Sequence, residues 1–145
     1  MATAGIAEIL KAASEQTDKA ARIKYLQDNQ SPALKKILGF CYDPVIEWLL
    51  PDSSPPYTPQ PKEADLQNVL YAEIRKLNIF VNHNDYLNLK TLARETQYIN
   101  LLESIDPDDA QLLIAIKNRV MPGFAANITK DLVAEAFPGI SKHWN

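Results

Sequence analysis

The stretch that decides the fold lies in the last third of the chain, which reads AIKNRVMPGF at 115–124 and LVAEAFPGI at 132–140. Its apolar spacing predicts a helix, a tight turn at Pro122-Gly123 and a second helix. An aromatic-Pro-Gly-aliphatic tail from Phe137 to Ile140 closes the unit. A helix that begins after a glycine-containing turn presents free N–H groups and can hold a phosphate. Two antiparallel helices with an ordinary turn explain the same residues without a ligand.

Helical signals continue outward from this unit to both ends of the chain. Ser31-Pro32 and Asp106-Pro107 each place a capping residue before a proline, which is a strong helix start. Thr17 and Thr129 are further candidate caps. We also predict a short helix after Asp43-Pro44 and longer ones over roughly 63–81 and 86–104. No segment alternates as a strand does. The pattern therefore predicts one compact all-α domain over 1–145 with about seven helices.

The segment 51–61 interrupts this pattern. It holds five of the ten prolines of the chain and therefore cannot be helical. We expect an extended strap between two helical halves, with Tyr57 on the surface of the core. A ligand for a proline-recognition module is the alternative interpretation.

Composition narrows the classes of function. The chain has 145 residues, a net charge of −3 and a single cysteine, Cys41. Cys41 lies in an apolar helical pattern, so we predict that it is a small core residue. We expect no membrane span, secretory signal or internal disulfide. The two histidines lack partners at metal-ligand spacing, and neither a nucleophile elbow nor a glycine-rich phosphate loop is present. We therefore predict a protein that is not an enzyme and has no cofactor or metal.

Acidic and basic residues each form one notable group. Asp106, Asp108 and Asp109 stand at a predicted helix start, where capping explains them better than cation binding. The basic candidates are spread over several predicted helices, and on an acidic chain they form a phosphate-binding surface only if the fold gathers them. These candidates are Lys35, Lys36, Lys117, Arg119 and Lys130, with Gly123 allowing close approach of a backbone.

Two resemblances add to this interpretation. The segments IAEIL at 6–10, AARIKYL at 20–26, LKKI at 34–37 and KDLVAEAFPGI at 130–140 resemble the N-terminal DNA-binding domain of ATP-dependent DNA ligases from T-even-type bacteriophages. The segments PPYTP at 55–59, LYAEIRKL at 70–77, RET at 94–96 and EAFPG at 135–139 resemble an uncharacterised family of T-even-like phages, particularly those of cyanobacteria.

The ligase resemblance implies an all-helical domain that grips duplex DNA from the minor-groove side. The chain has no Lys-x-Asp-Gly motif, so it lacks the lysine that ligases adenylate. Where the ligase domain has an Arg-Gly pair, this chain has Tyr42-Asp43-Pro44. The resemblance therefore implies binding without catalysis.

Three functional hypotheses follow. The first is a non-enzymatic phage accessory protein that binds double-stranded DNA through its backbone, in the cytoplasm of the infected bacterial host. The second is a protein-interaction module that binds a host or phage replication or repair factor through the strap or an acidic face. The third is a virion or assembly component. The sequence leaves the oligomeric state open.

Overall fold

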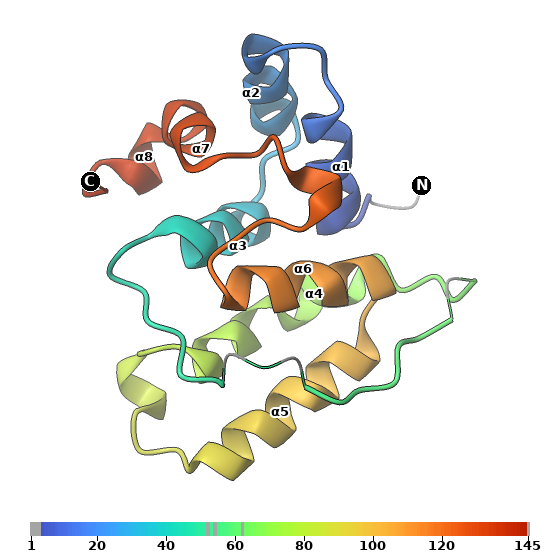
Figure 1. Cartoon of the computed structure of the whole chain (residues 1–145), viewed down its shortest axis with the longest axis vertical. Coiled ribbons are helices and arrows are strands. Elements are labelled where there is room, and N and C mark those ends of the chain that lie inside the picture. The colour runs from blue at the N-terminus through green and yellow to red at the C-terminus, as the bar shows by residue number, and fades with distance from the viewer. Residues whose placement is uncertain (1–3, 52, 54, 62, 145) are drawn as a thin grey trace.

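The chain folds as an all-α protein, as its sequence predicts. The computed structural model describes residues 4–51, 53, 55–61 and 63–144 (Figure 1). Within these ranges there are eight α-helices and three 3₁₀ helices. The elements are α1 (Ile6–Ser14), α2 (Lys19–Asp28), α3 (Pro32–Tyr42), α4 (Val69–Glu73), η1 (Ile74–Phe80), η2 (Asn84–Tyr86), α5 (Thr91–Ser104), α6 (Pro107–Lys117), η3 (Gly123–Ala125), α7 (Lys130–Ala136) and α8 (Pro138–Ser141).

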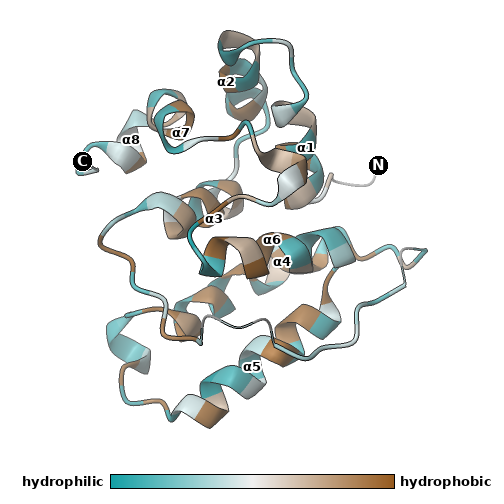
Figure 2. Ribbon diagram, viewed as in Figure 1, coloured by the Kyte–Doolittle hydropathy of each residue, from teal (hydrophilic) through white to brown (hydrophobic). Residues whose placement is uncertain are grey.

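Helix α6 lies at the centre of the arrangement. It packs against α1 and α3 on one side and against α5 on the other (Figure 1). Much of α6 is hydrophobic, as are the parts of α3 beside it (Figure 2). One buried apolar cluster includes Leu34 of α3, Leu102 of α5 and Leu113 of α6. Because this cluster joins residues from before and after 51–61, the two halves of the sequence share one core.

Three predicted helix starts are confirmed. Ser31 Oγ accepts a hydrogen bond from the backbone N–H of Leu34 at 3.1 Å. Asp106 Oδ1 accepts from the N–H of Asp108 at 2.9 Å, and Thr129 Oγ1 from that of Leu132 at 3.3 Å. Helix α2 is capped by Asp18 in place of the predicted Thr17, and its carboxylate accepts from Ala21 N–H at 2.8 Å.

The prediction of a short helix after Asp43-Pro44 is wrong. Residues 45–50 contain no helix, and Trp48 instead forms an isolated antiparallel bridge with Val81. The N–H of Leu49 donates to Phe80 O at 2.8 Å, and Asn82 N–H donates to Glu47 O at 3.0 Å. This pairing satisfies backbone groups of the segment. The partner lies more than thirty residues away in the chain, so sequence alone assigned the segment to a helix.

The predicted helix over 63–81 is shorter and partly of another kind. An α-helix covers only Val69–Glu73, and the chain continues as a 3₁₀ helix over Ile74–Phe80. In a 3₁₀ helix side chains three residues apart share a side, which suits Leu77 and Phe80, both fully buried.

The predicted helix over 86–104 begins only at Thr91. The apolar Leu92 is 75% exposed, whereas the charged Arg94 is buried. The Arg94 guanidinium donates to Ile79 O at 3.0 Å and to Tyr86 O at 2.8 Å. The buried face of α5 therefore includes a charged residue, Arg94, and the spacing of apolar residues alone does not predict this.

The strap is not helical in any of its described residues. Its Thr58 N–H donates to Glu103 Oε2 at 2.8 Å, and the Gln60 amide donates to the carbonyl of Glu103. Tyr57 is half-buried against the core, as predicted. The strap is therefore fixed along α5.

Candidate nucleic-acid interface

Two of the predicted cations lie next to each other on α3. The ammonium of Lys35 stands 5.6 Å from the centre of the Phe137 ring, and that of Lys36 stands 5.4 Å from the Phe40 ring. Both side chains are half-buried along these rings, with the charge attracted to the aromatic face. The rings thereby hold two ammonium groups at defined positions on α3.

A third cation, Arg75 of η1, acts on Lys36 from a distant part of the sequence. Burial lowers the pKa of Lys36, and the positive charge of Arg75 lowers it further. Among the described residues, no carboxylate forms an ion pair with Lys35, Lys36 or Arg75. We call these three residues the basic patch. Like charges held together without a counter-charge favour an anion between them.

A groove of about 480 Å³ opens beside Lys35. It is bordered by the tail motif of Phe137, Pro138 and Gly139, and by the amide side chains of Gln27 and Gln30. Asp28 also lines the groove, but its carboxylate is paired with Lys24 at 3.1 Å. The tail motif thus contributes one wall of a polar groove next to the basic patch.

Lys117 lies inside the protein. Its side chain is only 5% exposed, and its ammonium donates to Pro51 O at 2.6 Å and to Ser53 O at 3.3 Å. Asn118 Oδ1 accepts from the same ammonium at 3.3 Å. The charge therefore fastens the start of the strap to the end of α6.

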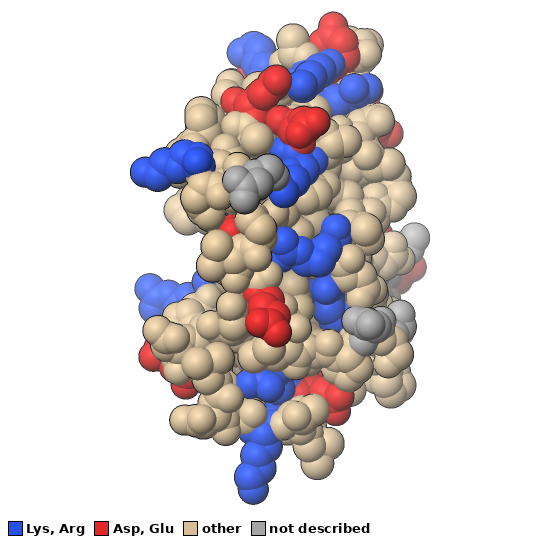
Figure 3. Space-filling model, turned by 60° about the vertical axis from the view of Figure 1, so that its left-hand side comes forward, with Lys and Arg blue, Asp and Glu red and all other residues tan. Residues whose placement is uncertain are grey.

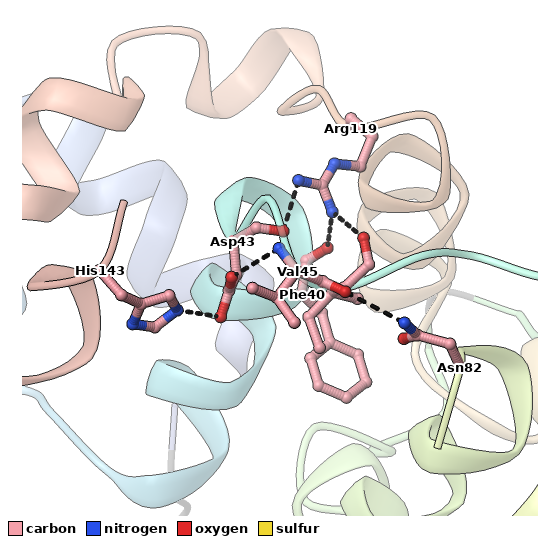
Figure 4. A network of polar contacts seen from close by, with 7 residues as sticks. Phe40, Asp43, Val45, Asn82, Arg119 and His143 are labelled. Atoms are coloured by element: carbon pink, nitrogen blue, oxygen red, sulfur yellow. Dashed lines mark hydrogen bonds and ion pairs between the residues drawn. The ribbon is translucent and has the colours of Figure 1, made fainter. Parts of the chain in front are cut away.

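Arg119 also points toward backbone oxygens (Figure 4). Its guanidinium donates to Asp43 O at 2.6 Å, to Ile46 O at 2.9 Å and to Phe40 O at 3.5 Å. The Asp43 carboxylate in turn accepts from Val45 N–H at 2.9 Å and lies 2.9 Å from His143 Nε2. Arg119 is the only non-glycine residue with positive φ (66°) among those described. Through its three hydrogen bonds to backbone oxygens, Arg119 clamps the loop after α3.

The two remaining predicted residues lie at the start of η3 and at the start of α7. Gly123 begins η3 and is exposed, and a Cβ atom added there meets nothing within 4 Å. No contact within the protein therefore requires a glycine at this position. Lys130 is half-buried in the first turn of α7.

The surface charge of one face is mixed (Figure 3). Lys and Arg side chains form several separate groups down this face, with Asp and Glu groups between them. The fold does not bring all the predicted cations together on the surface, because it turns Lys117 and Arg119 toward backbone oxygens. It leaves Lys35 and Lys36 on α3, with Arg75 near Lys36.

The acidic residues at the start of α6 act as helix caps. Asp106 caps α6 itself, as predicted. Asp109 is only 1% exposed, and its Oδ1 accepts from the N–H of Ala7, in the first turn of α1, at 2.9 Å. Its other oxygen has no hydrogen-bond partner among the described residues. Asp109 thus fixes α6 to α1.

The described residues contain no group of three or more His, Cys, Asp or Glu side chains arranged to hold a metal ion. Cys41 is buried, as predicted, and burial raises its thiol pKa to about 12. A thiol with so high a pKa is a poor nucleophile at neutral pH. None of the described helices combines the length and the apolar character that a bilayer crossing needs.

Arg75 is the functional candidate that sequence reasoning missed. It lies next to Lys76, which pairs with Glu73 at 2.8 Å as an ordinary surface ion pair does. Its approach to Lys36 is a tertiary contact between residues of different elements, η1 and α3. No local pattern signals a contact of this kind.

Comparison with known proteins assigns a family but no activity. No curated protein and no solved structure matches the chain. A family of unknown function, DUF6433, matches residues 9–122. That range runs from α1 to the turn that follows Arg119 and covers most of the core. The chain therefore belongs to the DUF6433 family.

Proposed function

We propose that this protein is a non-enzymatic accessory protein that binds double-stranded DNA through its sugar-phosphate backbone, without strong sequence preference. The observation that carries the proposal is the basic patch, in which Lys35 and Lys36 are consecutive on α3 and Arg75 is close enough to lower the pKa of Lys36. None of the three has a carboxylate ion-pair partner among the described residues. Phosphates are the natural counter-charge for such a group.

The surroundings of the patch support the same ligand. The groove beside Lys35 offers the exposed backbone of Gly139, a typical partner of phosphate oxygens. The amides of Gln27 and Gln30 each donate to a backbone carbonyl and have a second N–H that can serve a phosphate. The resemblance to the DNA-binding domain of phage ligases supports a duplex and a phage source, with action in the cytoplasm of the infected host. Lys117 and Arg119 are not part of the proposed contact surface, because backbone oxygens already surround their charges.

The test is fluorescence anisotropy with labelled intact and nicked duplexes at low and rising salt. We expect binding that weakens with salt, because released counterions drive it. The double variant K35Q/K36Q should bind more weakly at every sequence. Its slope of log K against log salt should fall by about 2, at roughly 0.9 per lost phosphate contact.

A matched control is K11Q/K90Q, which removes the same charge from two exposed lysines outside the basic patch. It should retain the wild-type slope. If neither duplex binds at low salt, the proposal is wrong. Equal losses of DNA affinity in the two double variants would show that net charge alone determines binding. They would exclude the basic patch as a specific site.

A protein-interaction module is the second candidate. Val45 and Val120 are 65% and 53% exposed and lie close in sequence to Asp43 and Arg119, which the clamp joins. Exposed apolar side chains next to a rigid backbone are typical of protein contacts. We expect V45S/V120S to fold normally and to lose a replication or repair factor, or a virion protein, that the wild type retains in affinity purification from infected cells. Identical protein profiles for both baits would contradict this candidate.

A further inference from the structure

The outward face of α5 carries no charge. The helix forms one edge of the molecule, and it packs against α6 and η1 (Figure 1). The spacing of three and four residues along a helix places its exposed side chains on one side. We call these exposed residues the neutral face, and they are Leu92, Ala93, Thr96, Gln97 and Asn100.

The neutral face differs from the exposed faces of other helices. Helix α1 exposes Glu8 and Lys11, and α7 exposes Asp131 and Glu135. Leu92, in contrast, is 75% exposed, more than any other large apolar side chain among the described residues. Apolar side chains without neighbouring charges are typical of the centre of a protein interface.

The two ends of this face carry opposite charges. Lys90 is the N-terminal capping residue of α5 and borders the same shallow hollow as Leu92. Glu103 lies in the last turn, three residues after Asn100, and its carboxylate accepts from Thr58 N–H at 2.8 Å. Neither charge forms an ion pair with a described residue. A cation at the start of a helix and a carboxylate at its end both oppose the helix dipole.

We propose that the neutral face binds a second copy of this chain, with the two α5 helices antiparallel about a two-fold axis. Lys90 of each copy then approaches Glu103 of the other, and each charge meets the end of a helix dipole that favours it. The midpoint between these two residues in the chain falls beside Thr96, which sets the position of the axis.

The residues around this axis suit contact with identical residues. The amide groups of Gln97 and Asn100 both donate and accept hydrogen bonds, so they can pair with the same groups of a second copy. The small side chain of Ala93 lets the helices approach closely. The face spans about 12 Å of helix, at about 1.5 Å per residue. Since this is less than a standard interface, the dimer is weak, with a Kd of roughly 10–500 µM.

The first test is sedimentation equilibrium of the full chain up to about 1 mM, where we expect a monomer–dimer equilibrium. K90E places a carboxylate opposite Glu103 of the other copy and should raise the Kd about 5- to 20-fold at low salt. L92S should raise it about 10-fold, because it removes apolar contact in both copies. The matched control K11E makes the same charge change on α1 and should stay within about 2-fold of wild type.

The second test is disulfide formation between copies under mild oxidation. Thr96→Cys lies beside the axis and should cross-link faster than Ala20→Cys, which is an exposed position of α2. Cys41 is buried and does not compete.

Three outcomes would overturn the proposal. A chain that stays monomeric up to about 1 mM would leave the neutral face to a different protein. A dimer that K90E and L92S leave unchanged would use another surface. Equal cross-linking of the two cysteine variants would exclude an axis beside Thr96.

Discussion

Arg119→Ala is expected to destabilise the protein by about 3 kcal/mol, because it removes a charged group that bonds to three backbone carbonyls. The carbonyl of Ile46 then depends on water, whereas the carbonyls of Phe40 and Asp43 each keep one other donor. Urea unfolding followed by tryptophan fluorescence measures the loss. Trp48 reports directly on the clamped loop, since its indole N–H donates to Phe40 O at 2.9 Å.

Two further substitutions separate the clamp from the backbone strain at this position. Arg119→Gly also removes the clamp, but glycine adopts a φ of 66° without strain. It should therefore be about 1 kcal/mol more stable than Arg119→Ala. Arg119→Lys keeps the charge but loses the planar fork, and should fall between wild type and alanine. Wild-type stability for Arg119→Ala would contradict a structural role and return this cation to the candidates for DNA contact.

Asp109→Asn is expected to stabilise the protein at pH 8 by about 2–4 kcal/mol, because Asp109 is buried with one carboxylate oxygen unpaired. Burial raises its pKa to about 7, against the hydrogen bond from Ala7, which lowers it. The negative charges of Asp106, Asp108 and Glu8 also contribute to this raised pKa. Asparagine keeps the oxygen that accepts from Ala7 and carries no charge.

The sign of the pH dependence follows from this shift. The folded-state pKa of about 7 exceeds the ordinary value of 3.8, so the folded state holds this proton more tightly than the unfolded state. The stabilisation is complete below pH 4 and is lost as the pH rises through 7. Between pH 5.5 and 8 the wild type should therefore lose roughly 2 kcal/mol relative to Asp109→Asn.

Urea unfolding of both proteins across pH 5.5–8 checks this expectation, and the difference between them cancels the titration of all other shared groups. Asp109→Ala serves as the control for the cap itself. It should be destabilised by about 1–2 kcal/mol relative to Asp109→Asn throughout this range, because Ala7 N–H loses its acceptor. Parallel stability curves for wild type and Asp109→Asn would show that the carboxylate does not titrate here.

The fold class and several element boundaries could be predicted from sequence because their causes are local. Ser31, Asp106 and Thr129 each bond to an N–H two or three residues ahead, and the spacing alone reveals this. The proline run at 51–61 excluded a helix for the same reason. The segments at 45–50 and 63–81 were mispredicted where remote contacts outweighed local preference.

The candidate sites depended on contacts that no local pattern contains. In the sequence, Lys117 and Arg119 look like surface cations beside a turn. Their backbone acceptors, however, lie between 64 and 79 residues away in the chain. Arg75 comes close enough to lower the pKa of Lys36 although the two residues lie in different elements, η1 and α3. The prediction of five cooperating phosphate contacts used the right residue types without knowledge of where each side chain points.

By itself, the sequence determined that the chain is helical, where three of its helices begin, that its lone cysteine is buried and that the proline strap is extended. These properties follow from short-range hydrogen bonds, fixed proline geometry and apolar spacing. Only the tertiary structure decided which charges are satisfied inside the protein, which remain together on the surface, and which face of α5 stays exposed. Those outcomes depend on which distant backbone oxygens and rings come within reach, and that is set by how the helices pack.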